Sequence, residues 1–311
     1  MSAQKIIIDT DPGQDDAVAI LFALASPDLE VLALTCVAGN VPLSLTQTNA
    51  RRLCDLAGVD VPVYAGCDKP LNRDLITAEH VHGKTGMDGY DWAEPVHPLQ
   101  SVNAVDYLIE TFRSEPANSI TLCTLGPLTN VAAALTQAPD IAERIKEIVI
   151  MGGAHFEGGN ITPMAEFNFY VDPEAADIVI KSGCKLVIHS LDVTHQALVD
   201  KTRLDRFANL GNAAGHAIAG MLGHGERFDL KQEAGSGIPL HDPCVLAYVV
   251  QPDLFSGKHV NVTTETTSEL CLGASVVDWW GVTDRPANAT FINAIDHDAF
   301  FELLYSRLAT V

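Results

Sequence analysis

The sequence predicts an α/β fold: a single Rossmann-like domain over residues 1–311, in which helices flank a largely parallel central sheet. Three observations support this prediction. Short, continuous apolar runs alternate with segments of helical periodicity, the runs lack the polar alternation of half-exposed strands, and no linker, repeat or low-complexity tract divides the chain. Strands that are apolar on both faces are typical of parallel sheets covered by helices on both sides. Ligands of such sheets bind at the carboxyl edge of the strands.

The elements follow one another in a regular order. An isoleucine run predicts the first strand at 5–11, and a Pro-Gly turn leads from it into a helix at 15–26. Further apolar runs predict strands at 31–39, 61–66, 119–126, 147–153 and 185–191. Helical spacing predicts helices at 43–58, 128–139 and 174–183. Residues 67–100 and 154–173 follow strand ends without a long periodic run, so each is either a binding loop or an ordinary surface insertion.

Composition excludes several classes of partner and location. The net charge of −21 argues against nucleic acid and anionic membranes, which would be repelled. The N-terminus has no apolar core typical of a signal peptide, and no window of about 18 uncharged apolar residues predicts a membrane span. The seven cysteines are scattered, without a CxxC pair, which is typical of reduced cysteine in the cytoplasm.

The stretch DTDPGQDDAVAI at 9–20 carries the most unusual pattern. Asp9 and Asp11 end the first predicted strand, and Asp15 and Asp16 begin the first predicted helix. A helix N-terminus stabilises a carboxylate by only about 0.3–1 kcal/mol, which accounts for one or two capping acids but not for four crowded ones. A hard cation with oxygen ligands would remove the repulsion. Capping by solvated acids is the alternative interpretation.

Two other acidic motifs fit less well. An EF-hand loop needs Gly at its sixth position and Glu at its twelfth, and neither Asp9 nor Asp11 as the first residue gives that pattern. An aspartyl phosphatase also places two acids two residues apart after its first strand. The spacing of Asp9 and Asp11 allows this class, but the Pro-Gly-Gln-Asp-Asp sequence after them does not fit it.

Three more stretches carry polar residues suited to a ligand. A loop at 158–176 contains Asn and Glu side chains, which offer paired donors and acceptors to hydroxyl groups, although Asn and Asp are also ordinary turn residues. His241 and Asp242 precede an apolar helix, where Asp242 is a natural N-cap. His80 and His82 lie in a glycine-rich loop, where a histidine is either a proton donor or simply exposed.

Together these stretches resemble the nucleoside hydrolase family, the inosine-uridine preferring N-ribohydrolases. The motifs that carry the resemblance occur in the order of the family and extend over nearly the whole chain. They are DTDPGQDDAVAI, LGPLTNVAAAL, IVIMGGA, NxTPxAEFNxxxDPEAA and HDP. The resemblance implies Ca²⁺-dependent hydrolysis of the N-glycosidic bond of ribonucleosides, which releases the base and ribose.

The resemblance also implies which residues form the site. It implies one Ca²⁺ per chain, held by Asp11, Asp16, Asp242 and the backbone carbonyl of Leu125, where family members often have Thr or Val. The nucleoside would contact Asp15, Asn40, Asn160, Glu166, Asn168 and Asp242. Asp9 would support the metal ligands from behind.

Proton transfer is implied for three side chains. Asp11 would take the proton of the attacking water, and His241 would protonate the leaving base. His82 matches a second histidine near the base in pyrimidine-preferring members. An N-glycosidic bond breaks through an oxocarbenium-like state, so hydrogen bonds to the ribose hydroxyls can strengthen as charge grows on the ring.

The match is loose at residues 222–236, so the sequence leaves the base preference open, with uridine, cytidine and inosine as the expected substrates. His224, Arg227, Phe228 and Gln232 are the candidates for base contacts, and we assign no site role to Trp279 or Trp280. By resemblance, we expect a homodimer or homotetramer. Two rival functions are a metal-dependent aspartyl phosphatase and a non-catalytic, Ca²⁺-dependent nucleoside sensor.

Overall fold

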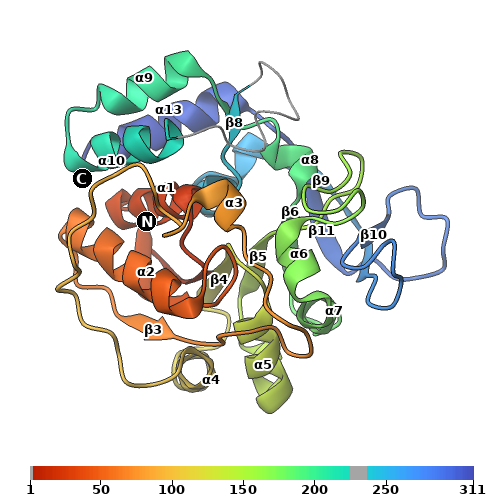
Figure 1. Cartoon of the computed structure of the whole chain (residues 1–311). Helices are drawn as coiled ribbons and strands as arrows, with labels where there is room; N and C mark the ends of the chain where they lie inside the picture. Colours follow the sequence, from red (N-terminus) through yellow and green to blue (C-terminus); the bar gives the residue numbers. More distant parts are fainter. Residues whose placement is uncertain (1–2, 225–236) are drawn as a thin grey trace.

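The computed structural model describes residues 3–224 and 237–311, and its centre is one large sheet with helices on both faces (Figure 1). Within these residues the sheet has the strand order β10-β9-β11-β6-β5-β4-β1-β2-β3. The strands from β11 to β3 are parallel, and β9 is antiparallel to both of its neighbours. The predicted α/β fold with a largely parallel sheet is confirmed.

The strands of this sheet come from both ends of the chain. Their bounds are β1 Gln4–Thr10, β2 Leu29–Cys36, β3 Val63–Ala65, β4 Ile120–Thr124, β5 Glu147–Met151, β6 Leu186–His189, β9 Phe255–Thr264, β10 Ser275–Asp278 and β11 Ala289–Ile295. A separate antiparallel pair is formed by β7 Leu198–Val199 and β8 Ile238–Pro239.

Helices connect most of the strands. The α-helices are α1 Gln14–Ala25, α2 Leu43–Ala57, α3 Glu79–His82, α4 Ala104–Ser114, α5 Thr129–Gln137, α6 Phe167–Val171, α7 Pro173–Ile180, α8 Leu191–Thr194, α9 Lys201–Ala208, α10 Ala213–Leu222, α12 Pro243–Val250 and α13 His297–Leu308. The described residues also form two 3₁₀ turns, at Pro139–Glu143 and Pro252–Leu254. Among the helices in the described part of the chain, none has both the length and the apolar composition that a membrane span requires.

Strand β1 illustrates how the sheet divides the core. Its side chains alternate between the two faces. Ile6 and Ile8 join the apolar cluster under α1, α10, α12 and α13, whereas Ile7 joins the cluster under α4, α5 and α7. All three isoleucines are fully buried. The continuous apolar run therefore reflects burial on both faces.

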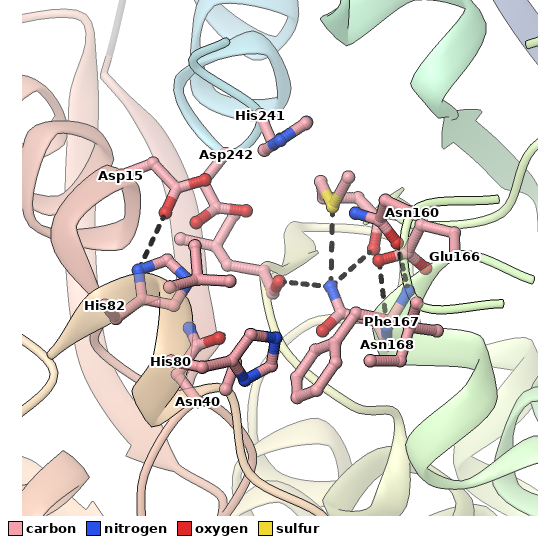
Figure 2. Close-up of a pocket in the computed structure, with 15 residues that line it drawn as sticks. Asp15, Asn40, His80, His82, Asn160, Glu166, Phe167, Asn168, His241 and Asp242 are labelled. Carbon is pink, nitrogen blue, oxygen red and sulfur yellow. Dashed lines mark hydrogen bonds and ion pairs between the residues drawn. The ribbon is translucent and has the colours of Figure 1, made fainter. Parts of the chain in front are cut away.

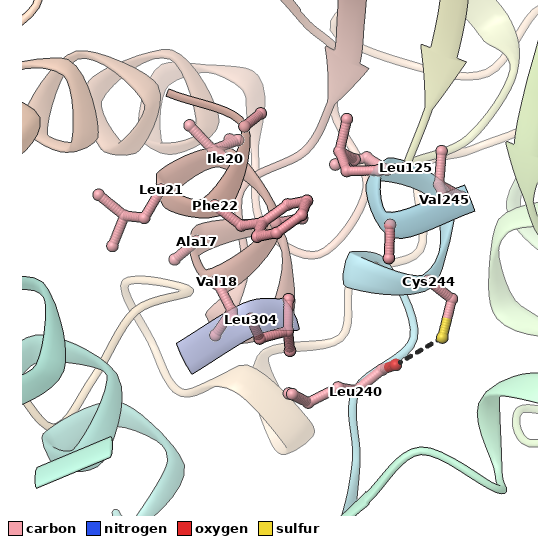
Figure 3. Close-up of a cluster of buried hydrophobic side chains, with 14 of the residues drawn as sticks. Ala17, Val18, Ile20, Leu21, Phe22, Leu125, Leu240, Cys244, Val245 and Leu304 are labelled. Atoms are coloured by element: carbon pink, nitrogen blue, oxygen red, sulfur yellow. Dashed lines mark hydrogen bonds between the residues drawn. The ribbon is translucent and has the colours of Figure 1, made fainter. Parts of the chain in front are cut away.

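Helix α1 is enclosed by its neighbours, since every residue from Gln14 to Ala23 is buried. It packs against α2, α10, α12 and α13. Figure 3 shows Phe22 among side chains from these elements, including Val245 of α12 and Leu304 of α13. Burial of one such side chain is worth about 1.5–3 kcal/mol. This packing fixes the first turn of α1, and with it two carboxylates, at the edge of the sheet.

The carboxyl ends of β1 and β4 lie side by side, with Asp9 in register with Thr124. The chain leaves β1 for β2 on one side, whereas β4 is followed by β5 on the other side. This reversal of strand order is the place where open α/β sheets form their ligand sites.

The structure refines the predicted boundaries. The strand expected at 61–66 is confined to Val63–Ala65, and the two expected loops each contain a short helix, α3 and α6. Helices of four and five residues are too short to produce a recognisable apolar period. The sheet also continues into β9 and β11, which were not among the expected strands.

Candidate active site

A cavity opens at the carboxyl edge of the sheet, next to the ends of β4 and β5. Figure 2 shows Asp15, His82 and Asn40 on one side of it and Glu166 and Asn168 on the other. Its lining residues come from segments that are far apart in the sequence: Asp15, Asn40, Ala78, His80, Val81, His82, Leu125, Met151, Asn160, Ile161, Glu166, Phe167, Asn168, His241 and Asp242.

An acidic cluster forms one end of the site. Carboxylate oxygens of Asp15, Asp16 and Asp242 lie within 4.8 Å of one another, and all three residues are buried. Buried carboxylates at this separation repel strongly, because little water screens them. The cluster therefore needs protons or a cation to be stable.

The backbone packs tightly around Asp11, which is fully buried beneath the cavity. The backbone N–H of Asn40 donates to Asp11 Oδ2 at 2.7 Å, while Asp11 Oδ1 is buried with no hydrogen-bond partner in the described part of the chain. A Cβ at Gly39 would lie 2.1 Å from Oδ2, and one at Gly126 would lie 2.3 Å from Oδ1. Only glycine therefore lets both backbone segments approach this carboxylate.

Asp16 is held from three directions. Thr10 Oγ1 donates to Asp16 Oδ1 at 2.5 Å, and the backbone N–H of Gly13 donates to Oδ2 at 3.0 Å. Asn40 Nδ2 donates to the same Oδ2 at 3.2 Å. The turn after β1 thus orients Asp16 before any ligand binds.

Burial shifts the proton equilibria of these acids. Burial, and then the negative charge of Asp16, raise the pKa of Asp11 well above its usual range. Burial, and then the charge of Asp15, raise the pKa of Asp16 to about 6. Burial, and then Asp16, likewise raise the pKa of Asp242. A bound cation would reverse each of these shifts, because it favours the charged form.

Asp242 occupies the N-cap position of α12 without capping it. Its side chain makes no hydrogen bond to the first turn of the helix, and Pro243 removes one of the N–H groups that would need a partner. The capping role that the sequence offered for Asp242 is therefore absent. Its carboxylate instead joins Asp15 and Asp16 in the acidic cluster.

The opposite wall is organised by Glu166 and Asn168. Glu166 caps α6 through Oε1, which accepts from Asn168 N at 2.8 Å, and its Oε2 accepts from Gly153 N at 3.0 Å. Burial raises the pKa of Glu166 to about 7, although these N–H groups oppose the shift. Asn168 Nδ2 donates to the backbone carbonyl of Leu125 at 2.7 Å. A carbonyl has two lone pairs, so Leu125 can accept this bond and still bind a cation.

Asn160 and Asp9 have roles within the scaffold. Asn160 Oδ1 accepts from the backbone N–H of Phe167 at 3.0 Å, which ties the loop before α6 to the helix. Asp9 lies behind the cluster, where its Oδ2 accepts from Thr35 Oγ1 at 2.6 Å and from Asn130 Nδ2 at 2.8 Å. Burial raises the pKa of Asp9 to about 7.

The histidines occupy different parts of the cavity wall. His241 is buried, and its Nδ1 lies 2.8 Å from Thr194 Oγ1. His82 is also buried, with Nδ1 3.4 Å from the backbone N of Gln14 and 3.9 Å from Asp15 Oδ1. The two contacts need different protonation states of Nδ1: the bond from Gln14 needs Nδ1 without a proton, whereas an ion pair or hydrogen bond with Asp15 needs Nδ1–H.

Nearly all of the predicted site residues therefore meet at one place. Asp11 and Asp16 lie beneath the cavity rather than in its lining, and Asp9 lies behind them. His224 lines a separate groove with Asp88 and Trp92. The other candidates for base contacts, Arg227, Phe228 and Gln232, lie outside the described residues.

Several lining residues were not predicted from the sequence. Ala78, Val81, Ile161 and Phe167 give the cavity an apolar wall. They occur in loops and in very short helices, where no periodic pattern marks them. Trp279 instead packs against Phe156 and Phe291, outside the cavity lining.

The donor set fits a hard metal ion. Asp11, Asp16, Asp242 and the Leu125 carbonyl offer only oxygen atoms, which Ca²⁺ and Mg²⁺ prefer. Asp11 Oδ1, which is buried and has no hydrogen-bond partner among residues 3–224 and 237–311, and the raised carboxylate pKa values are both features that a divalent cation would compensate.

Comparisons with known proteins agree with this arrangement. The chain matches the family model of the inosine-uridine preferring nucleoside hydrolases over residues 6–302. It is 43% identical to the pyrimidine-specific ribonucleoside hydrolase RihA of Shewanella sp. strain ANA-3, with 99% of this chain and 96% of that one covered. It is also 50% identical to an uncharacterized protein of Schizosaccharomyces pombe, with 98% of each chain covered.

Solved structures show the same fold. The purine-preferring ribonucleoside hydrolase of Gardnerella vaginalis superimposes with a TM-score of 0.92 at 29% identity, covering 98% of each chain. The plant nucleoside hydrolase PpNRh1 gives a TM-score of 0.90 at 33% identity, covering 99% of each chain. The sequence, the fold and the cavity therefore agree, and this chain belongs to the inosine-uridine preferring nucleoside hydrolase family, as a ribonucleoside hydrolase.

Proposed function

We propose that the enzyme hydrolyses the N-glycosidic bond of uridine, cytidine and inosine in a Ca²⁺-dependent reaction, giving the free base and ribose for nucleoside salvage. The observation that carries this proposal is the buried cluster of Asp15, Asp16 and Asp242, of which Asp15 and Asp242 face Glu166 and Asn168 across one cavity. Carboxylate and amide groups on two sides can bind the hydroxyls of a sugar, while the apolar wall accepts a flat base.

The proposed metal ligands are Asp11, Asp16, Asp242 and the Leu125 carbonyl, with one Ca²⁺ per chain. Bound there, the ion would polarise a water molecule and bind the sugar diol. The protein contributes a rigid set of oxygen atoms, because Asn40 and Thr10 hold two of the carboxylates by hydrogen bonds.

The proposed ribose-binding residues are Asp15, Asn40, Asn160, Glu166, Asn168 and Asp242. Asp15 is 4% exposed and Glu166 2% exposed, so sugar hydroxyls bound to them would be shielded from water. Hydrogen bonds in such a site gain strength when positive charge develops on the sugar ring.

Different side chains are proposed to accept and to donate the protons of the reaction. Asp11 is proposed to accept the proton of the attacking water, and His241 to donate a proton to the leaving base. His82 is proposed to assist near the base, where it lies beside Asp15. Bond cleavage then produces ribose with a new hydroxyl group and a neutral base.

The relatives support a pyrimidine preference. Enzymes named as pyrimidine-specific are 43% identical to this chain, whereas the structural neighbour named as purine-preferring is 29% identical. We therefore propose that uridine and cytidine are better substrates than adenosine.

The remaining expectations are proposals of the same kind. We propose that residues 1–311 form one domain, because a single sheet takes strands from both ends of the chain. A cytoplasmic location is supported by seven cysteines, none of which is in a disulfide. We also propose a homodimer or homotetramer, which size-exclusion chromatography with light scattering would test.

Turnover of uridine, cytidine, inosine and adenosine, measured by base release, tests the proposal. We expect release of uracil and cytosine, and a large loss of activity in Asp11→Ala. Release of inorganic phosphate from phosphate esters with Mg²⁺ would favour a phosphatase. Nucleoside binding without turnover would favour a sensor.

A further inference from the structure

We propose that Thr194 is a positioning residue for His241: its hydroxyl fixes the imidazole so that Nε2 carries a proton into the cavity. The inference rests on the proposed role of His241 as proton donor. It adds a residue from α8, a helix that contributes no side chain to the cavity lining in the described part of the chain.

The contact between the two side chains is short and buried. Thr194 is fully buried, His241 is 8% exposed, and Thr194 Oγ1 lies 2.8 Å from His241 Nδ1. In the described residues, Nδ1 is the one partner within hydrogen-bond distance of this hydroxyl. An unpaired buried hydroxyl would cost free energy, so the hydroxyl donates to Nδ1. A neutral ring with this bond carries its proton on Nε2.

Thr194 Oγ1 and His241 Nδ1 can also form a hydrogen bond when the ring is charged, with the direction of donation reversed. A hydroxyl can accept as well as donate, so Nδ1–H of an imidazolium would donate to the same oxygen. The ring orientation is thus independent of the protonation state. A half-turn of the ring about its broad torsion exchanges its nitrogen and carbon atoms, and the hydroxyl favours the orientation that places Nδ1 beside it.

Helix α8 is firmly attached to the site. The backbone N–H of Leu191 donates to Gly153 O at 2.9 Å. The Asp192 carboxylate accepts from the backbone N–H groups of His155 at 2.8 Å and Phe156 at 2.6 Å. These bonds attach the helix to the segment that follows β5.

The segment carrying His241 is attached to the residues that directly follow α8. The backbone N–H of Leu240 donates to Ala197 O at 3.0 Å, and β7 pairs with β8 just before it. Thr194 and His241 therefore lie on two segments that hydrogen-bond to each other. The 2.8 Å contact is built into this local framework and does not depend on a mobile side chain.

The test compares Thr194→Val, which keeps the shape but removes the hydroxyl, with Thr194→Ser, which keeps the hydroxyl. Two substrates separate the roles: uridine, whose base needs a proton to leave, and p-nitrophenyl riboside, whose phenolate leaves without one. We expect Thr194→Val to reduce kcat on uridine about 10–100-fold, at least roughly tenfold more than on p-nitrophenyl riboside. We expect Thr194→Ser to restore most of this selectivity.

Thr46→Val is the matched control. Thr46 is also fully buried, and its hydroxyl donates to Leu43 O at 3.1 Å in α2, outside the cavity. The Thr46→Val variant should change Tm without changing the ratio of the activities on uridine and p-nitrophenyl riboside. Equal losses of Thr194→Val on both substrates, or no loss on uridine, would overturn the proposal.

A measurement on the wild-type protein covers the case in which Thr194→Val does not fold. Long-range ¹H–¹⁵N correlation of the histidine rings, with His241→Gln for assignment, should show the Nε2–H tautomer for neutral His241. A predominant Nδ1–H tautomer would overturn the inference. Failure of the wild type to hydrolyse any ribonucleoside would refute the proposed function itself. Uridine turnover with unselective losses in His241→Ala would refute only the proton-donor role and, with it, this inference.

Discussion

Asn40 and Asp11 are joined by two hydrogen bonds, one from the backbone of Asn40 to the side chain of Asp11 and one from the side chain of Asn40 to the backbone of Asp11. The backbone N–H of Asn40 donates to Asp11 Oδ2 at 2.7 Å, and the Asn40 side chain donates to the Asp11 backbone carbonyl at 3.2 Å. The same Nδ2 also reaches Asp16 Oδ2 at 3.2 Å. Asn40, in the loop that follows β2, thus orients two carboxylates that belong to the turn after β1.

Replacement of Asn40 by alanine tests this organisation. Asn40→Ala removes the side-chain bonds to Asp11 and Asp16 but keeps the backbone bond. We expect Ca²⁺ affinity to fall roughly 10–100-fold, because groups that orient metal ligands have effects of this size. Isothermal titration of the metal-free protein measures it.

Asn212→Ala is the control for loss of an amide at a distance from the site. Asn212 caps α10 and donates to Leu308 O at 2.8 Å. This variant should lose stability and keep its metal affinity. Equal metal affinities for Asn40→Ala and the wild type would contradict the role of Asn40.

Two aspartates at helix starts provide a second comparison. Asp242 does not cap α12, whereas Asp296 caps α13 by accepting from Ala299 N. Asp296→Ala should lower stability by about 1 kcal/mol and leave the Tm increase on Ca²⁺ addition intact. Asp242→Ala should raise the Tm of the metal-free protein, since it removes a repelling buried acid, and should abolish most of the Ca²⁺-dependent increase. Thermal melts with EGTA and with Ca²⁺ measure both, and an intact Ca²⁺ response in Asp242→Ala would refute its role as a ligand.

The sheet and the acidic turn were predictable because both depend on local sequence. The isoleucine run of β1 and the spacing from Asp9 to Asp16 indicate a buried strand that ends in acidic residues, and this indication does not depend on the rest of the sequence. The short helices α3 and α6 were not predictable, because their positions follow from packing around the cavity.

The distribution of roles within the site also escaped the sequence pattern. Nothing local indicates that Asp242 leaves its own helix uncapped or that Asn168 meets the carbonyl of Leu125. The pattern likewise does not separate Asp15, which lines the cavity, from Asp11 and Asp16, which lie beneath it. These assignments depend on how distant segments meet, so they needed the fold or the family resemblance.

Stability should depend on pH through Asp9. Burial raises its folded pKa to about 7, whereas an unfolded aspartate titrates near 3.9. A raised folded pKa means that the stabilising contribution is present below about pH 4 and is lost as pH rises through about 7. Asp9→Asn keeps an oxygen acceptor for Thr35 and Asn130 but cannot ionise. Its stability relative to the wild type should therefore increase between pH 4 and 8, by an amount on the order of 1 kcal/mol or more.

Urea unfolding in EGTA across this pH range measures the effect. Asp140→Asn is the control, because the Asp140 carboxyl is exposed and its hydrogen bond to Arg113 lowers its pKa. This control should show no such increase. If the free energies of unfolding of Asp9→Asn and the wild type differ by a constant amount from pH 4 to 8, the folded pKa of Asp9 is not raised and the prediction is wrong.

Uridine turnover before and after removal of Ca²⁺ tests the central claim most directly. Protein stripped with EGTA should lose activity by roughly a hundredfold or more, because a catalytic metal is worth several kcal/mol. Titration with Ca²⁺ should restore uracil release in parallel with the binding of one ion per chain, measured by metal analysis. Full turnover by protein that is shown to contain no divalent metal would contradict the account.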